Sequence, residues 1–137
     1  MRSVRNKLTE LNKLLHNNFS PIKIIALTET WLDDSFPSSA LGLDDYNIFR
    51  KDRGTRGGGI MLATHKNIVA NAVPLKCITE ILAVDITNVH NTKIRVVISY
   101  NPSINNIEYI ESLFKTLSEC IYSVPVYVVL GDFNMTT

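Results

Sequence analysis

Residues 126–134 read Val-Tyr-Val-Val-Leu-Gly-Asp-Phe-Asn, an apolar run that stops at an acid and an amide. Such a short run of β-branched and apolar residues predicts a buried strand, here over Val124–Leu130. Two similar runs occur at residues 23–29, Lys-Ile-Ile-Ala-Leu-Thr-Glu, and at residues 94–100, Ile-Arg-Val-Val-Ile-Ser-Tyr. Each run ends in a polar side chain, and sites in open α/β sheets form beyond strand ends. We therefore expect the functional residues to lie where these strands end.

The rest of the chain alternates between helical and strand-like patterns. Val4, Leu8, Leu11 and Leu15 have helical spacing, and so do the apolar residues of segment 104–122. Segment 32–45 is rich in Asp, Ser, Pro and Gly, which predicts a loop with one helical turn. Further strands are predicted at 22–27, 46–50, 59–64, 68–73, 81–87 and 93–100, the last two as a hairpin. This order is typical of a mixed α/β (α+β) fold with antiparallel pairs in its middle.

Composition limits the class of protein. The chain has 137 residues, 45% of them hydrophobic and 20% charged, which suits one globular domain rather than a disordered chain. Its net charge of +1 gives no long-range attraction to nucleic acid, so any basic surface is local. The basic residues gather at Arg50, Lys51, Arg53, Arg56 and Lys66.

Neither a membrane span nor a secretory signal is visible in the sequence. An intracellular location is therefore expected. Cys77 and Cys120 lack metal-ligand spacing, and we expect two reduced, partly buried thiols, with a disulfide between them as the alternative.

The polar residues at the strand ends form a candidate site. Glu29, Asp132 and Asn134 offer carboxylate and amide oxygens, and Tyr100 offers a hydroxyl group. Oxygen ligands of this kind suit Mg²⁺, which binds through one or two carboxylates and keeps several waters. Taken singly, each residue could equally be the first polar residue of a turn, or a tyrosine of the core. Spacing alone does not separate these interpretations.

The same residues carry a family resemblance. Thr28-Glu29-Thr30-Trp31-Leu32 resembles the glutamate motif of the endonuclease/exonuclease/phosphatase superfamily, and Gly131-Asp132-Phe133-Asn134 is similar to its Gly-Asp-Phe-Asn motif. Segments 2–7 and 48–59, the latter with its Arg-Gly-Gly-Gly, resemble the branch found in non-LTR (LINE-type) retrotransposons. The ordered set spans nearly the whole chain, which makes it more specific than any one motif.

This resemblance implies a four-layer αββα sandwich that hydrolyses phosphodiester bonds and nicks target DNA with Mg²⁺ or Mn²⁺. Glu29 would bind the metal, which offsets charge on the phosphate. Asp132 would orient or deprotonate water, Asn134 would hold that water or a phosphate oxygen, and Tyr100 would donate a hydrogen bond to the phosphate. Arg50, Lys51, Arg53 and Arg56 would contact the DNA backbone. The parent polyprotein would include a reverse transcriptase, and the protein would act in the nucleus.

The sequence departs from the family pattern in several places. The family has an asparagine ahead of the Arg-Ser segment, and an aspartate and a Ser-Asp-His motif after Gly-Asp-Phe-Asn. Its Tyr-Arg-Pro-Pro is here Tyr100-Asn101-Pro102-Ser103. We therefore expect residues 1–137 to be a single incomplete domain, a partial sandwich without its first strand and C-terminal part. Such a domain is expected to be inactive by itself and prone to aggregate or dependent on a partner.

Two other functions remain open from the sequence. One is a small-molecule or lipid phosphodiesterase or phosphatase of the same superfamily. The other is a catalytically dead remnant or a nucleic-acid-binding module, in which the basic cluster is either a DNA contact or only a solvated surface with Asp52 partly neutralising it. The Gly57-Gly58-Gly59 run lacks the Lys-Ser/Thr of a nucleotide-binding loop and indicates a tight turn or a close backbone approach.

Overall fold

The structure, a computed structural model, describes residues 10–11, 23–53, 57–75, 79–87, 90–101, 107–122 and 124–132. Its elements, in chain order, are β1 (Ile24–Thr28), the 3₁₀ turn η2 (Ser38–Leu41), β2 (Tyr46–Lys51), β3 (Ile60–His65), β4 (Val69–Val73), β5 (Glu80–Thr87), β6 (Lys93–Tyr100), α2 (Ile107–Tyr122) and β7 (Tyr127–Asp132). Glu10 and Leu11 are helical, and the rest of the predicted N-terminal helix lies outside the described residues.

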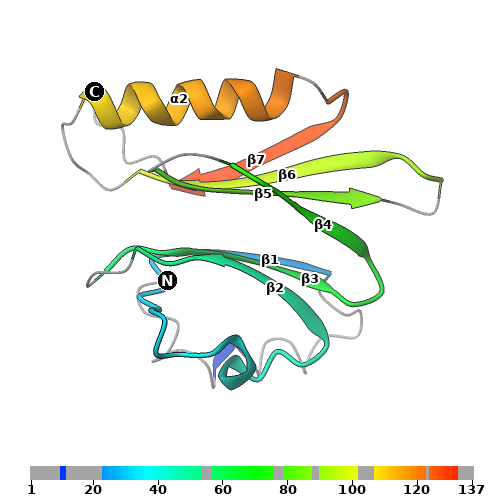
Figure 1. The fold of residues 1–137 in the computed structure, drawn as a ribbon. Coiled ribbons are helices and arrows are strands. Elements are labelled where there is room, and N and C mark those ends of the chain that lie inside the picture. The colour runs from blue at the N-terminus through cyan, green and yellow to red at the C-terminus, as the bar shows by residue number, and fades with distance from the viewer. Residues whose placement is uncertain are drawn as a thin grey trace.

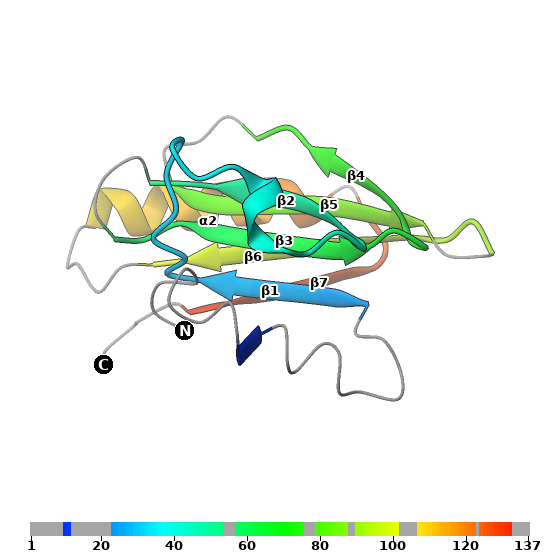
Figure 2. The ribbon, with the colours of Figure 1, turned by 90° about the horizontal axis from the view of Figure 1, so that it is seen from below.

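Two sheets face each other in the molecule. The smaller has the order β1-β3-β2 with antiparallel pairing, and the larger has the order β4-β5-β6-β7. In the larger sheet β6 and β7 are parallel, and the other pairs are antiparallel. Figure 1 shows α2 covering the outer face of the larger sheet, with η2 below the smaller one. Turned by 90°, the same ribbon shows the edge strands β1 and β7 on one side of the sandwich (Figure 2).

The main core lies between the sheets and follows from the alternation of side chains along each strand. In β3, Ile60 and Leu62 point into this core, where they pack with Val84 of β5 and Ile98 of β6. Met61, between them, packs instead against Leu11, Leu32, Leu41 and Leu43 on the opposite face of the smaller sheet. β3 is therefore buried on both faces, as expected of a central strand.

A second core joins the larger sheet to α2. Leu113, Leu117 and Cys120 of the helix pack on Ile81, Ala83 and Val97 of the sheet. These three helical positions recur at the spacing that the sequence predicts for one apolar face. Cys120 is a free, buried thiol, whereas Cys77 lies outside the described residues. Within the described part of the chain, no helix is long and apolar enough to cross a membrane.

The prediction that the last strand is buried is wrong. In β7, Tyr127, Val128 and Leu130 are 47%, 45% and 40% exposed. The reason is position: β7 is the edge strand of the larger sheet and pairs only with β6 among the described elements. The similar apolar run at residues 23–29 also predicts a buried strand, but β1 is an edge strand too, and only Ile25 in it is buried.

Candidate functional site

The end of β1 places Glu29 at the rim of the sandwich. Glu29 and Trp31 have φ angles of 52° and 57°, in the left-handed region that residues with side chains rarely adopt. The backbone there is held by the glycine turn that precedes β3. Thr30 N donates to Gly59 O at 3.2 Å, and Trp31 N donates to Gly58 O at 2.9 Å. Unfavourable backbone angles that the surroundings enforce are typical of functional sites, which makes this rim a candidate site.

Tyr100, the last residue of β6, reaches across from the other sheet to Glu29. Its hydroxyl group donates a hydrogen bond to Glu29 Oε1 at 3.0 Å. Burial, followed by this hydrogen bond and the charge of Glu29, raises the pKa of Tyr100 to about 12. The side chain is therefore a neutral phenol at ordinary pH, a hydrogen-bond donor rather than a base.

Asp132 lies beside Tyr100, because β7 runs parallel to β6 and the two residues are partners in the register. The backbone also joins the two ends, since Asn101 N donates to Asp132 O at 2.8 Å. A pocket between the sheets is lined by Asp132 together with Ala26, Thr28, Ile98, Leu130 and Gly131. One pocket thus contains Asp132 and the residue that precedes Glu29. The strand ends named from the sequence do converge, while their chemical roles stay predictions.

A buried carboxylate, Glu80, lies one strand further along. Glu80 is the partner of Tyr100 in the β5–β6 register and is 6% exposed. Its carboxylate accepts hydrogen bonds from Gly59 N and from Arg53, whose NH2 atom lies 3.0 Å from Oε2. The Arg53 guanidinium carbon also lies 5.9 Å from the centre of the Tyr100 ring. Among the described basic residues, Arg53 is therefore the one whose side chain contacts Glu80 and Tyr100 at this rim.

The other described basic residues of the same segment, Arg50 and Lys51, are held by other partners. Arg50 forms a salt bridge of 2.6 Å with Asp52 and donates to the backbone oxygens of Asp33 and Phe36 at 2.9 and 2.7 Å. Lys51 Nζ donates to Thr79 O at 2.6 Å. Asp52 does neutralise a neighbour, as expected, but the Arg50–Asp52 pair is only 15% and 12% exposed rather than solvated. Arg56 and Asn134 lie outside the described residues.

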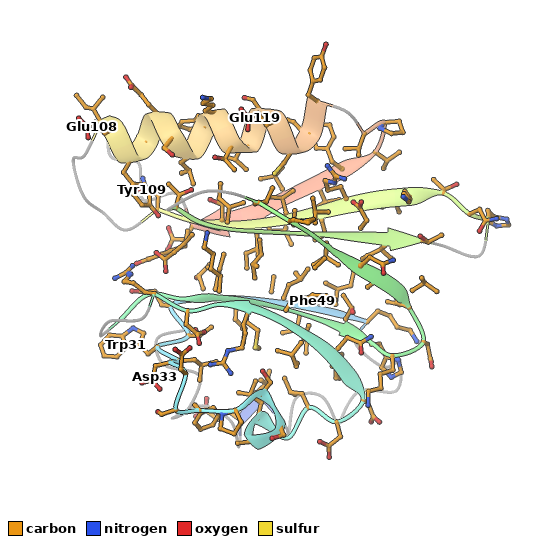
Figure 3. All side chains as sticks on the ribbon, viewed as in Figure 1. Trp31, Asp33, Phe49, Glu108, Tyr109 and Glu119 are labelled. Carbon is orange, nitrogen blue, oxygen red and sulfur yellow. The ribbon has the colours of Figure 1, made fainter. Side chains whose placement is uncertain are left out.

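Two residues of the rim were not identified from the sequence. Glu80 is one, and Tyr109 of α2 is the other: its hydroxyl group donates to Tyr100 O at 3.2 Å and accepts from Glu80 N at 3.1 Å. Figure 3 shows Tyr109 below the helix and Trp31 beside the smaller sheet, at the same end of the sandwich. The hairpin register alone could have found Glu80, because pairing across residue 90 puts it opposite Tyr100.

The donor set can be tested for its fit to a divalent metal ion. Glu29 and Asp132 supply carboxylate oxygens at neighbouring strand ends, and Tyr100 supplies a hydroxyl. Among the described residues, no group of three or more His, Cys, Asp or Glu side chains could enclose a metal ion. The donors of the rim are oxygen atoms, which do not suit a structural zinc site but are the kind of ligand through which Mg²⁺ or Mn²⁺ binds proteins while keeping several waters.

Comparisons with solved structures agree with the architecture. The chain is similar to a 3′ phosphatase from Neisseria bound to a product DNA hairpin (18% identity, TM-score 0.67), with 98% of this chain and 55% of that one covered. It is similar to a 3′-5′ exonuclease from Neisseria meningitidis (19%, 0.69; 97% and 55% covered) and to an AP endonuclease from Archaeoglobus fulgidus (16%, 0.64; 98% and 55% covered).

These similarities confirm the predicted fold, a mixed α/β sandwich of the endonuclease/exonuclease/phosphatase type. The chain spans about half the length of the solved structures that it matches, 55% in each case. No protein-family model matches the sequence. No curated protein matches it either.

Proposed function

We propose that this chain carries the metal-binding and phosphate-facing part of a nuclease that hydrolyses phosphodiester bonds in DNA. The observation that carries the proposal is the hydrogen bond from Tyr100 to Glu29, which joins two sheets at the rim beside Asp132. That rim gathers oxygen ligands and a hydroxyl donor at three strand ends. The nuclease and phosphatase structures of the same fold support DNA as the substrate class.

Each rim residue has a role in this proposal. Glu29 would hold Mg²⁺ or Mn²⁺, with Asp132 as the neighbouring carboxylate that orients or deprotonates water. The bound ion would offset the charge that develops on the phosphate. Tyr100, kept protonated by its surroundings, would donate its hydrogen bond to a phosphate oxygen when substrate arrives. Asn134 would hold the water or a phosphate oxygen.

The finer assignment is a retrotransposon-type endonuclease that nicks target DNA. It rests on the Arg-Ser segment near the N-terminus and on Arg56-Gly57-Gly58-Gly59. Reading the coding sequence on either side of this segment tests it separately. A reverse transcriptase in the same reading frame supports this origin, whereas flanking sequence that encodes a repair enzyme contradicts it.

Plasmid nicking tests the activity itself. Supercoiled DNA is incubated with an excess of the chain, with Mg²⁺ or with EDTA, and the open-circle product is measured. The sequence departures predict an inactive domain, whereas the rim residues that the chain does carry predict slow residual nicking. This nicking should need Mg²⁺, be lost in Glu29→Ala and in Asp132→Ala, and be kept in Lys115→Ala on the exposed side of α2. Loss of one preorganised electrostatic group typically lowers the rate by about 10²–10³.

Two outcomes would count against the proposal. Equal nicking by all variants would point to a contaminating nuclease. Absence of nicking, combined with DNA binding that weakens as salt is raised, would favour the binding-module alternative instead.

A further inference from the structure

The Gly57–Gly59 turn is more than a tight connection, because it makes room for one side chain. All three glycines have positive φ angles, of 87°, 65° and 87°. A Cβ atom on Gly58 would collide with the guanidinium group of Arg53, and a Cβ atom on Gly57 would lie 3.6 Å from Arg53 NH1. The guanidinium group therefore lies against the backbone of the turn, in space that only glycine leaves open.

Glu80 fixes the direction of that guanidinium. Its two carboxylate oxygens divide their hydrogen bonds between Gly59 N and Arg53 NH2, so one buried acid ties the turn and the arginine together. A carboxylate at 6% exposure needs such partners to offset the loss of water. Arg53 is thus held in place by Glu80 and by the glycine turn, while its side chain remains 31% exposed to solvent.

The position faces the rim of the candidate site. The guanidinium carbon lies 5.9 Å from the ring of Tyr100, whose hydroxyl group is the one that contacts Glu29. Its bond to Glu80 is single, so the planar fork keeps N–H groups without a partner among the described residues. Arginine forks of this kind suit a phosphate group, which accepts two parallel hydrogen bonds.

We propose that Arg53 is the phosphate-binding cation of this rim and that the Gly57–Gly59 turn is the seat that positions it. This inference rests on the proposed function, since it names the residue that would bind the DNA backbone at that same site. It also divides the basic segment, because Arg50 is used to hold the loop around residues 33–38. Arg53 alone of these described arginines faces Tyr100.

The binding of a short DNA duplex, measured by fluorescence anisotropy in EDTA over a range of salt concentrations, tests the proposal without any turnover. Arg53→Gln is compared with Lys115→Gln, a matched loss of one positive charge on the exposed side of α2. We expect Arg53→Gln to weaken binding about tenfold. It should also lower the slope of log affinity against log salt by about one. Lys115→Gln should change neither quantity.

Gly58→Ala tests whether the position of Arg53 matters as well as its charge. The variant keeps Arg53, but its added Cβ atom occupies the space in which the guanidinium group lies. We expect it to weaken DNA binding by a similar factor, and to weaken it no further when Arg53 is already glutamine. Thermal melting of each variant checks that the chain is folded, and the double variant distinguishes displacement of Arg53 from a general loss of stability.

The outcomes distinguish this inference from the function on which it rests. If the wild-type chain binds DNA and Arg53→Gln binds as Lys115→Gln does, Arg53 is not the phosphate-binding residue while the nuclease proposal stands. If Gly58→Ala weakens binding equally in both backgrounds, the turn is not a seat for Arg53. If the wild-type chain neither binds nor nicks DNA, the function and the inference are both wrong.

Discussion

The two ends of the β5–β6 hairpin each hold an arginine beside a carboxylate, and they use it differently. At one end Arg95 donates from Nε and NH2 to both oxygens of Asp85, at 2.8 and 2.9 Å, and from NH1 to Cys120 O at 2.8 Å. At the other end Arg53 makes one hydrogen bond within the described part of the chain, to Glu80. All three guanidinium nitrogens of Arg95 donate to the protein, whereas Arg53, beside Tyr100, has N–H groups without a partner among the described residues. A fully paired ion pair serves the fold, and a partly paired one is suited to a ligand.

The two ends of the hairpin also differ in the exposure of their arginines and in the backbone around them. Arg95 and Asp85 are each 13% exposed and lie beneath α2, whereas Arg53 is more exposed and lies at a rim with left-handed backbone at Glu29 and Trp31. If this contrast is right, removal of Arg95 lowers stability without altering ligand binding, and removal of Arg53 alters ligand binding with little loss of stability.

Removal of Arg95 should have the largest effect on stability. Arg95→Ala leaves Asp85 as an uncompensated charge at low exposure and Cys120 O without this donor, which typically costs about 3–5 kcal/mol when one partner of a buried pair is lost. Urea denaturation measures the change in the free energy of unfolding. Lys115→Ala, at an exposed position on α2, is the control and should change it little. Equal free energies of unfolding for the two variants would show that the contacts of Arg95 do not stabilise the fold.

Gly131→Ala should have the next largest effect on stability, at the end of the sheet that holds Tyr100. A Cβ atom at this position would collide with the backbone oxygen of Ser99 on β6. Because backbone cannot yield as a side chain can, β7 must shift away from β6, at a cost of about 1–3 kcal/mol. Thermal melting measures the loss of stability, and Mg²⁺-dependent nicking should fall with it as Asp132 moves. Full activity in this variant would mean that the close approach of β7 to β6 does not position Asp132.

Acid should weaken the Arg95 end. The hydrogen bond and charge of Arg95 hold the pKa of Asp85 below its ordinary value of 3.8, against the opposing effect of burial. A lowered pKa contributes stability that is present above pH 3.8 and is lost as the pH falls through the folded-state pKa. The stability difference between wild type and Asp85→Asn should therefore shrink below that pH in denaturation curves. A difference that stays constant into strong acid would contradict the pairing.

Tyr100→Phe should have the smallest effect on the fold. It removes one hydrogen bond to Glu29, worth about 1 kcal/mol. Because the pKa of Tyr100 is raised from 10.0 to about 12, the phenol form stabilises the fold fully below pH 10 and this contribution is lost as the pH rises toward 12. Ultraviolet titration should show a late-ionising tyrosine that is absent from the Phe variant. A wild-type titration complete near pH 10 would count against the hydrogen bond.

Much of the framework could be predicted from the sequence. Strand β6 was expected over residues 93–100 and is observed as Lys93–Tyr100, because alternating apolar residues and a polar turn define both of its ends. The convergence of Glu29, Tyr100 and Asp132 was also expected, since all three follow apolar strands. In contrast, the exposure of β7 could not be predicted, because its apolar run is as strong as that of β3 and only the order of strands in the sheet distinguishes an edge from a centre.

The different partners of the neighbouring residues Arg50 and Arg53 could not be predicted from the sequence either. Arg50, Lys51 and Arg53 read as one basic cluster, and their separation depends on partners far away in the sequence. Arg50 meets Asp33 and Phe36, whereas Arg53 meets Glu80. The Arg53–Glu80 pair follows from the stacking of the two sheets, and the Arg50 contacts follow from the path of the loop between β1 and β2, so neither could be predicted from local pattern.

Cation binding tests the central idea most directly, that strand ends from two sheets form one site for a divalent ion. Mn²⁺ is titrated into the chain and followed by electron paramagnetic resonance, with Glu29→Gln, Asp132→Asn and the double variant. We predict that Mn²⁺ binding is weakened by either single change and that the double variant loses less than the sum of the two single losses, as expected for residues that share one ion. Binding that is unchanged in both single variants would contradict the account.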